Sequence, residues 1–436
     1  MIELREYATK EFDGQAPPSH IQVSIRRQLR GRLEILWLSG NRVRVASTQW
    51  VGVVRLPDGQ SIRIVPKLAG GELRVMTMLG LVGGLPSAEM DRMHRDLRTA
   101  PDGDALELLC RMMVRAASAV LTAGPLRDYR PQLDDVGFVR GRMNTRRQGL
   151  HHFGRVDVLA CEFQEFDHDV LENRLICVAL AKVRTASLDS ETRRRALILH
   201  EEFLRLAPGP VPPPAQIRRE VVYDRRNEHY RSAHVWSLAL LEDALLDSPF
   251  SDAGASTTAF LIDMNALFEQ FVMWLVKKCF AGGDISIRPQ QRDGTVLRSD
   301  GKRWGTLIPD LLICRQDARI AVDAKYKRYD LRRISPSDVY QLLIYAQAYR
   351  GFTPHPRSIL LYPTESAVQD IQIDLTPGVG QIASVVATGI ELSRILRLLS
   401  TDHGRALELV ASQLSAALGG LPNSLGPRNQ APRNPA

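Results

Sequence analysis

The sequence predicts an α+β protein of several domains, with a β-rich N-terminal domain, a mainly helical middle region and a C-terminal α/β domain. Three observations support this prediction. The chain has 436 residues, which is enough for about three domains. Apolar residues alternate with period two near the N-terminus and recur at helical spacing in the middle. Towards the C-terminus, short apolar runs are interspersed with helical segments.

The N-terminal domain is predicted to cover residues 1–95. Its strand pattern is clearest at 43–45, 51–56 and 61–65. The last two runs are separated by a segment that contains Asp58-Gly59, and Asp-Gly between alternating apolar runs is a strong hairpin signal. We therefore expect a small β domain with a hairpin at this point.

The middle region, residues 96–247, has the period of helices. One amphipathic helix begins at Ala105 and is stopped by Gly124-Pro125. A second is expected near Asp169, whose carboxylate can cap the helix start, and a third over residues 191–206. Five prolines between residues 208 and 214 predict an extended connector after the third helix.

The C-terminal region, residues 248–418, alternates helical and strand patterns. Helices are expected over 261–280 and 337–349, and strands over 286–289, 306–314, 319–326 and 358–363. This order describes a compact α/β domain. Residues 419–436 are rich in Gly, Pro and Asn without an apolar period, and this composition predicts a disordered tail.

Composition excludes several classes of protein. The five cysteines include no Cys-x-x-Cys pair, so neither a disulfide framework nor a structural zinc module is expected, and a reducing cytoplasm fits best. No apolar run reaches the length of a membrane span, and the N-terminus lacks a secretory signal, so no membrane association is expected. The net charge of +8 suits a polyanionic partner such as nucleic acid, and it equally suits an ordinary solvated surface.

The residues with the clearest chemical meaning are Asp310, Asp323 and Lys325. If 306–314 and 319–326 are adjacent strands of a hairpin, Asp310 lies opposite Asp323, and period two places Asp323 and Lys325 on one face. Two carboxylates would hold Mg²⁺, with Mn²⁺ as the alternative ion, and the lysine would orient or help deprotonate an attacking water. The chemistry indicated is hydrolysis of a phosphodiester.

Three further residues fit the same site. Glu269, on the preceding helix, could add a carboxylate. Gln341 and Tyr345 are four residues apart and therefore share a face of the following helix, from which they could contact the site or the DNA backbone. Each motif alone is weak, but the combination in this order favours a nuclease.

The order PD…DAK followed by QLLIY resembles the PD-(D/E)xK (restriction-endonuclease-like) nuclease fold in its RecB-type variant. From residue 1 to about residue 400, the chain also resembles the McrC family, the nuclease subunits of McrBC 5-methylcytosine-specific restriction systems. The segments that carry this wider resemblance are residues 50–68, 138–144, 163–176 and 260–272.

This resemblance implies roles for the site residues. Metal-ligand roles fall to Asp310 and Asp323, a supporting acidic role to Glu269 and the catalytic lysine role to Lys325. Gln341 and Tyr345 match the trailing motif. Asp323 stands where Glu is often found, a difference that the pattern permits.

The resemblance also implies a partner, a McrB-like AAA+ GTPase ring that recognises modified cytosine in double-stranded DNA. The chain has no GxxxxGK[ST] motif of its own, since Gly301-Lys302 is followed by Arg303. The expected function is a Mg²⁺-dependent DNA endonuclease subunit that cleaves when bound to this ring and stimulates its GTPase through residues 1–95. Two alternatives are a nuclease-silent activator of the ring and a stand-alone repair or RNA-processing nuclease.

Two further groups of side chains are candidates for nucleic-acid contact. Arg140, Arg142, Arg146 and Arg147 form a basic run that could meet phosphates, and a solvated face is an equal alternative. A set of tyrosines could stack on bases, although their spacing favours packing: Tyr326, Tyr329, Tyr340, Tyr345 and Tyr349.

Overall fold

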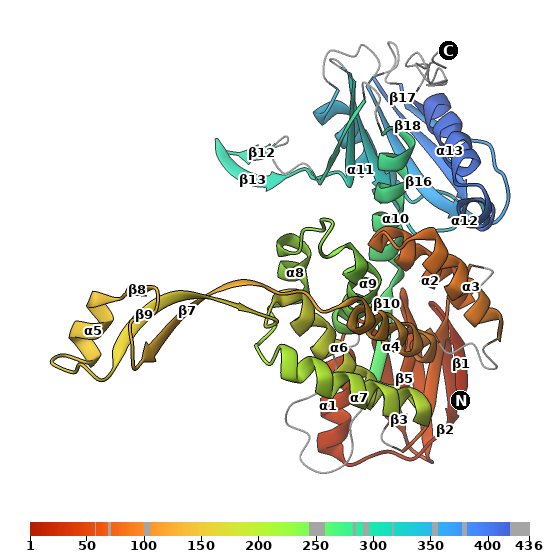
Figure 1. The fold of residues 1–436 in the computed structure, drawn as a ribbon. Coiled ribbons are helices and arrows are strands. Elements are labelled where there is room, and N and C mark those ends of the chain that lie inside the picture. The colour runs from red at the N-terminus through yellow and green to blue at the C-terminus, as the bar shows by residue number, and fades with distance from the viewer. Residues whose placement is uncertain are drawn as a thin grey trace, which may run out of the picture. The chain divides into compact units, whose positions relative to one another are not determined.

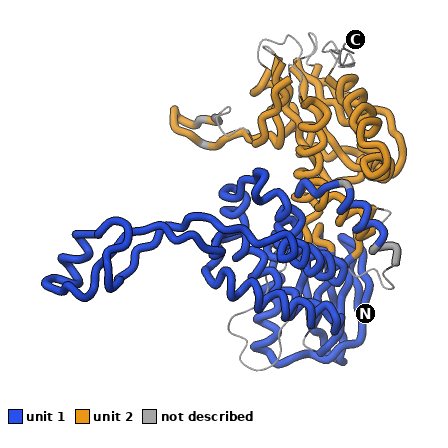
Figure 2. The backbone as a smooth tube through the Cα atoms, in the orientation of Figure 1, with its two compact units in different colours: residues 1–48, 52–64, 83–261 blue, residues 49–51, 65–82, 262–436 orange. Residues whose placement is uncertain are grey.

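The computed structural model describes most of the chain: residues 1–56, 58–68, 71–99, 105–243, 258–281, 285–290, 296–315, 318–350, 356–376 and 382–418. The chain divides into two compact units, drawn in different colours in Figure 2. Unit 1 contains residues 1–48, 52–64 and 83–261, and unit 2 contains residues 49–51, 65–82 and 262–436. The three-part division at 95 and 247 stays a prediction, and the predicted tail, 419–436, lies outside the described residues.

Two small sheets begin the chain. Their strands are β1 (Ile2–Arg5), β2 (Thr9–Asp13), β3 (Leu33–Leu38), β4 (Arg42–Ser47), β5 (Trp50–Arg55), β6 (Ser61–Val65) and β10 (Thr258–Asp263). One sheet has the order β1-β6-β5-β10 and the other β2-β4-β3. The antiparallel pairing of β5 with β6, in which Arg55 faces Ser61, confirms the predicted hairpin.

The predicted helix over 261–280 is wrong at its start. Residues 258–263 form β10, and the helix α10 (Met264–Cys279) begins only after Asp263, whose carboxylate accepts the N–H groups of Asn265 and Ala266 at 2.9 and 3.3 Å. Gly52 lets β10 pass close to β5, because a Cβ at its φ of +137° would overlap the carbonyl oxygen of Phe260. This long-range strand pairing has no local sequence signal.

Unit 1 also contains a group of helices: α1 (Ser19–Leu29), α3 (Ser87–Thr99), α4 (Ala105–Ala123), α6 (Leu171–Ala186), α7 (Ser190–Leu206), α8 (Pro214–Glu220) and α9 (Arg231–Asp243). α4, α6 and α7 confirm the three predicted helices, and α6 packs against α4, α7 and α9. Asp169 does not cap α6. Its carboxylate instead binds the Arg174 guanidinium at 2.6 and 2.8 Å and the Gly209 N–H at 3.1 Å, and Val170 takes the cap position.

A long β-ribbon extends from these helices and was missed by the prediction of a mainly helical middle region (Figure 1). Its strands are β7 (Asp128–Val136), β8 (Arg142–Met143) and β9 (Leu159–Asp167), in the order β7-β9-β8, with the short helix α5 (Thr145–His151) near its end. Charged residues are dense in β7 and β9, so neither strand has the clean apolar alternation on which strand prediction depends.

A six-stranded sheet forms the centre of unit 2. In the order β11-β14-β15-β16-β18-β17, its strands are Ser286–Pro289, Leu311–Arg315, Ala318–Ala324, Arg357–Thr364, Ala383–Glu391 and Ile371–Leu375. β15, β16 and β18 are parallel, whereas β11, β14 and β17 pair antiparallel with their neighbours. The predicted strands within 286–289, 306–314, 319–326 and 358–363 therefore lie in one sheet, although β14 begins only at Leu311.

Helices cover this sheet. α11 (Pro336–Ala348) packs against β15, β16 and β18, and it confirms the predicted helix over 337–349. α10 packs against β11, β15 and α13 (His403–Ala417), while α12 (Leu392–Thr401) contacts β18 and α13. The remaining elements of this unit are most of α2 (Gly71–Gly83) and the hairpin of β12 (Val296–Ser299) and β13 (Lys302–Thr306). Among the helices of the described ranges, none has both the length and the apolar composition that crossing a bilayer requires.

Candidate active site

The candidate site lies where β14 begins and β15 ends. The two strands pair antiparallel with Leu311 opposite Val322, so the next pair outward brings Asp310 opposite Asp323. The backbone N–H of Ala324 donates a hydrogen bond of 2.8 Å to Oδ2 of Asp310 and fixes its carboxyl group there. The hairpin that the sequence predicts is confirmed.

Lys325 follows directly after β15. Its ammonium nitrogen lies 2.9 Å from Oδ2 of Asp323, as expected for residues two apart in extended backbone. Its own N–H donates to the carbonyl of Leu361 at 2.9 Å, which continues the pairing of β15 with β16. The lysine is therefore held by both its backbone and its side chain.

Burial and like charges shift the pKa values of the two aspartates. Burial, with the charges of Asp323 and Glu269 added, raises the pKa of Asp310 to about 7. Burial also raises the pKa of Asp323, and the attraction of Lys325 offsets this only in part. Burial lowers the pKa of Lys325, but the two aspartates outweigh this effect and hold the pKa above its ordinary value. Lys325 is consequently a stable ammonium.

Glu269 lies on α10 and is close enough for its charge to raise the pKa of both aspartates. Its side chain is half-buried, and Oε1 accepts a hydrogen bond of 3.2 Å from Nε2 of Gln290. The backbone N–H of Gln290 also donates to the carbonyl of Asp310 at 3.0 Å. Gln290 thus connects α10 to the site. The carboxylate of Glu269 is a third acidic group near Asp310 and Asp323.

Gln341 and Tyr345 do share a face of α11, and they contact each other. Nε2 of Gln341 donates to the Tyr345 hydroxyl at 3.0 Å, and this hydroxyl donates to the carbonyl of Ile308 at 2.9 Å. One turn later, the hydroxyl of Tyr349 donates to the carbonyl of Leu307 at 2.5 Å. Both tyrosines are buried, so in this structure they anchor the segment that leads into Asp310.

Two residues near the site were not assigned to it by the sequence analysis, in which Tyr349 was only a candidate for stacking and Asp338 had no role. Tyr349 repeats the four-residue spacing of Gln341 and Tyr345, and this repeat is the signal that could have identified it. Asp338 lies in the first turn of α11 and accepts hydrogen bonds from Tyr329 and from Ser335, the cap residue of this helix. The Lys327 ammonium lies 2.7 Å from the same carboxylate, so Asp338 organises the segment after Lys325.

The oxygen ligands of this site fit a hard divalent cation. In the part of the chain that the structure describes, no three acidic, histidine or cysteine side chains are close enough together to form a complete metal cage. Mg²⁺ needs no such cage, because it is usually bound by one or two carboxylates together with water and substrate phosphate. The raised pKa values of Asp310 and Asp323 also fit a cation site, since a bound cation would favour the charged form of both carboxyl groups.

The four arginines of the basic run lie on the β-ribbon of unit 1 and divide into two pairs. Arg140 lies 2.7 Å from Glu165 and over the ring of Phe163, and Arg147 lies 2.9 Å from Asp135. Arg142 and Arg146 are exposed and, among the described residues, have no ion pair. These last two guanidinium groups are the ones available to bind phosphate.

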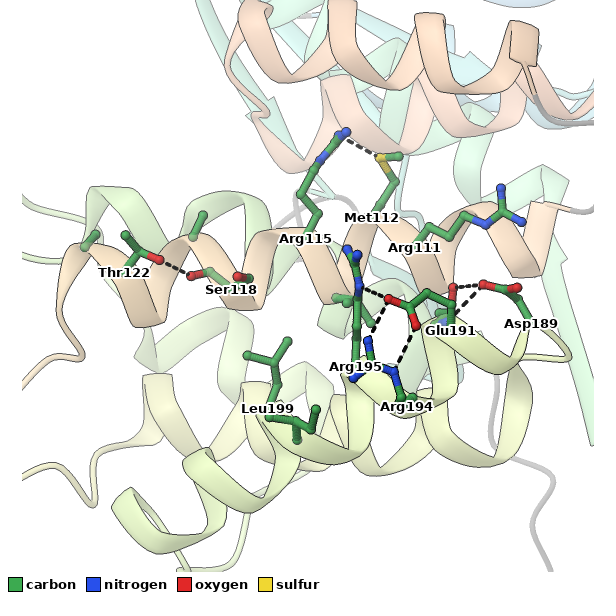
Figure 3. Close-up of a pocket in the computed structure, with 15 residues that line it drawn as sticks. Arg111, Met112, Arg115, Ser118, Thr122, Asp189, Glu191, Arg194, Arg195 and Leu199 are labelled. Carbon is green, nitrogen blue, oxygen red and sulfur yellow. Dashed lines mark hydrogen bonds and ion pairs between the residues drawn. The ribbon is translucent and has the colours of Figure 1, made fainter.

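A pocket lies between α4 and α7 in unit 1 (Figure 3). It has a volume of about 980 Å³ and contains four arginines, of which Arg194 and Arg195 lie 2.9 and 2.6 Å from Glu191. Asp189 is occupied by capping Thr192 at the start of α7. The acidic groups of this pocket are thus committed to local contacts, and the pocket contains none of the predicted site residues.

Comparisons with known proteins agree with the resemblance seen in the sequence. Residues 45–363 match the model of the family described as McrBC 5-methylcytosine restriction system component. No curated protein matches the chain.

Two solved structures, both from Thermococcus gammatolerans, have a similar fold. A chain in a half-complex from a tetradecameric assembly of McrB AAA+ hexamers with bound McrC has a TM-score of 0.59 and 15% identity, over 95% of this chain and 99% of that chain. A chain in a cryo-EM structure of the McrBC complex has a TM-score of 0.43 and 18% identity, over 64% of this chain and 88% of that chain. The first likeness supports a mixed α/β multidomain fold.

Proposed function

The chain belongs to the family of McrBC 5-methylcytosine restriction system components, and from this premise we propose that it is the DNA endonuclease subunit of such a system. In this proposal it acts in the cytoplasm on double-stranded DNA that contains modified cytosine. It does so when bound to a McrB-like AAA+ GTPase ring, whose GTP hydrolysis it stimulates. The observation that carries the proposal is the convergence of Asp310, Asp323 and Lys325 at one strand end.

Asp310 and Asp323 are the residues that would hold Mg²⁺, or Mn²⁺, with Glu269 in support. The ion, when bound, supplies Lewis-acid polarisation of a phosphate oxygen and offsets negative charge. The protein's contribution is to hold the two carboxyl groups next to each other in a buried place, so that their mutual repulsion favours a cation over an empty site. The core would then have the PD-(D/E)xK type.

Lys325 has a defined part in this proposal. Because its pKa is raised, it stays an ammonium at neutral pH, and this state orients a water and stabilises charge on the attacked phosphate. The same state argues against a role in removing a proton from water. Asp323, at 2.9 Å, keeps the ammonium charged and in place. Gln341 and Tyr345 position the segment before Asp310.

Two surfaces are candidates for contact with the ring. The first is the surface of residues 1–95, which the sequence analysis proposed. The second is the end of the β-ribbon, where large apolar side chains are exposed although nothing in the described residues covers them: Phe138, Val139, Leu150, Phe153 and Val156. Exposed apolar clusters of this kind are typical of protein interfaces. We propose that the ribbon end shares the contact with the N-terminal surface.

One reconstitution separates this proposal from its alternatives. Purified chain, McrB-like partner, GTP and Mg²⁺ are combined with methylated plasmid DNA, and cleavage and GTP hydrolysis are followed together. The proposal expects cleavage that depends on all components, and GTP hydrolysis that rises when the chain is added. Stimulated GTP hydrolysis without cleavage would identify a nuclease-silent activator. Cleavage that needs neither partner nor GTP would identify a stand-alone nuclease.

A further inference from the structure

Unit 2 contains a pocket that is lined by none of the residues predicted for the active site. It has a volume of about 630 Å³ and lies among the segment 329–336, the first half of α11 and the edge strand β17. Its floor is apolar, with Ile334 buried and with Val339 and Ile373 packed against the same core cluster. Pockets of this size accept one small molecule or one nucleotide, and they are too small for a duplex.

The charged groups at this pocket leave a positive excess. Arg332 and Arg333 are exposed, and within the described residues neither has an ion pair. Among the described residues of the lining, Asp330 is the one acid, and it is neutralised by Arg328, whose guanidinium binds it through two nitrogens at 2.8 and 2.6 Å. Arg332 lies 5.9 Å from the centroid of the Tyr329 ring, a contact that leaves its N–H groups able to bind an anion as those of Arg333 are, and planar guanidinium suits phosphate.

One aromatic side chain is available at the same pocket. Of the five tyrosines proposed for stacking, four are buried with exposures of 2 to 5%, whereas Tyr340 is 65% exposed. Tyr340 lies on α11 and lines the pocket. An exposed aromatic ring beside unpaired guanidinium groups is the combination by which proteins hold single nucleic-acid strands.

The pocket is connected to the candidate active site through the chain itself. The segment that begins at Lys325 runs to the pocket and then into α11, the helix that carries Gln341 and Tyr345. Asp338 anchors this segment through Lys327 and Tyr329, and its charge reaches Lys325. The lining of the pocket thus begins at Tyr329, within the same segment that starts at Lys325.

We propose that this pocket binds one unpaired nucleotide of the DNA strand next to the phosphate that is cleaved. The base stacks on Tyr340, and the phosphate oxygens bind Arg332 and Arg333. The proposal rests on the nuclease function proposed above and adds a site that selects a locally opened strand over a closed duplex.

Strand binding tests the proposal without cleavage. The full chain is titrated, in EDTA, against a fluorescein-labelled DNA 12-mer by anisotropy at several salt concentrations. Tyr340→Ala is expected to weaken binding about fivefold or more, which corresponds to the stacking of one base, while Tyr340→Phe retains wild-type affinity. Arg332→Gln with Arg333→Gln is expected to reduce the salt slope by about 1.4, the value for two phosphate contacts on a single strand.

A matched control is Arg397→Gln, since Arg397 is exposed on α12 of the same unit and has no ion pair among the described residues. It should bind as the wild type does. All of these substitutions are at exposed positions, so the thermal midpoints should stay near that of the wild type. As a direct measurement, a strand that contains 5-bromodeoxyuridine should crosslink to Tyr340 on irradiation, and peptide mapping identifies the residue.

Unchanged strand binding by both the Tyr340→Ala and the arginine variants, or crosslinks only at other residues, would overturn the proposal. Tenfold tighter binding of an RNA of the same sequence would overturn the assignment to DNA. The outcomes for the two proposals are distinct. If the reconstituted system cleaves DNA but the variants bind strands as the wild type does, only the pocket proposal is overturned. If the variants lose strand binding but the wild type does not cleave, only the nuclease function is overturned.

Discussion

The ammonium of Lys325 lies 2.9 Å from Oδ2 of Asp323, with Asp323 near the end of β15 and Lys325 directly after it. Across the hairpin, Asp310 is fixed by the N–H of Ala324. One ammonium therefore faces two buried carboxyl groups. If both were ionised, the site would carry an excess negative charge, which a bound cation or a proton on one carboxyl group would neutralise.

Substitution at the site is expected to remove cleavage and to leave the fold intact. Asp310→Ala, Asp323→Ala and Lys325→Ala should each lower the cleavage rate by about 100-fold or more, because each removes a cation ligand or the ammonium. The rates are measured with partner, GTP and Mg²⁺ present, and partner binding serves as the control for folding. Wild-type rates in any two of the three variants would contradict the assignment.

The stability of the metal-free chain should depend on Asp310. Its pKa is about 7 in the folded chain and near 3.8 in the unfolded chain, so the folded state binds the proton more tightly. The contribution of this group to the free energy of unfolding is therefore fully present below pH 4. It decreases as the pH rises from 4 to 7, and above pH 7 a few kcal/mol of stability have been lost. Denaturant unfolding of the wild type and of Asp310→Asn across this pH range measures the difference. Identical pH profiles of the two proteins would contradict a raised pKa of Asp310 in the folded chain.

Mg²⁺ should stabilise the chain through the same carboxylates. At a free concentration 100 times the dissociation constant, a single site contributes about 2.7 kcal/mol. The thermal midpoint of the wild type should rise with Mg²⁺, while those of Asp310→Asn and Asp323→Asn should not. The rise for Glu269→Gln is expected to be intermediate, since the carboxylate of Glu269 lies near Asp310 and Asp323 and only supports their binding of the ion. An equal rise in all four proteins would place the ion elsewhere.

Contact with the ring is best tested by surface substitutions. Deleting residues 1–95 would remove β5 and leave β10 without its neighbour in the sheet, so that loss of function would be ambiguous. We expect Phe138→Ser with Phe153→Ser, at the ribbon end, to weaken binding to the partner about tenfold by removing buried apolar contact. Val23→Ser, at an exposed position of α1, is the matched change within residues 1–95. A larger effect at Val23 would assign the contact to the N-terminal surface.

Duplex DNA should bind the isolated chain weakly and without preference for methylated sites, because the expected contacts are between guanidinium groups and phosphates, which carry no sequence information. Arg142→Gln with Arg146→Gln should weaken this binding and lower the salt slope by up to about 1.8. Arg140→Gln with Arg147→Gln should change it less, since those side chains are already paired. A preference of tenfold or more for the methylated duplex would locate specificity in this chain.

Much of the site could be predicted because its signals are local. A short hairpin brings Asp310 and Asp323 together, and strand alternation brings Asp323 to Lys325, so the spacing in the sequence is nearly the spacing in space. The same holds for Gln341 and Tyr345, which are one helical turn apart. Residue periodicity alone was enough to find α4, α7 and α11.

Other features were decided only by tertiary structure. Strand β10 pairs with β5 across two hundred residues of chain, and the β-ribbon is held by pairing between β7 and β9, neither of which leaves a local pattern. The same limit applied to the tyrosines. Their spacing was compatible with either packing or stacking. Tertiary contacts buried four of them, Tyr326 against Phe268 of α10 and the other three in core clusters of the sheet, and left Tyr340 exposed. The sequence determined which functional groups lie close together along a hairpin or a helix turn. The fold determined which side chains are exposed to solvent, because burial depends on segments that are distant in the chain.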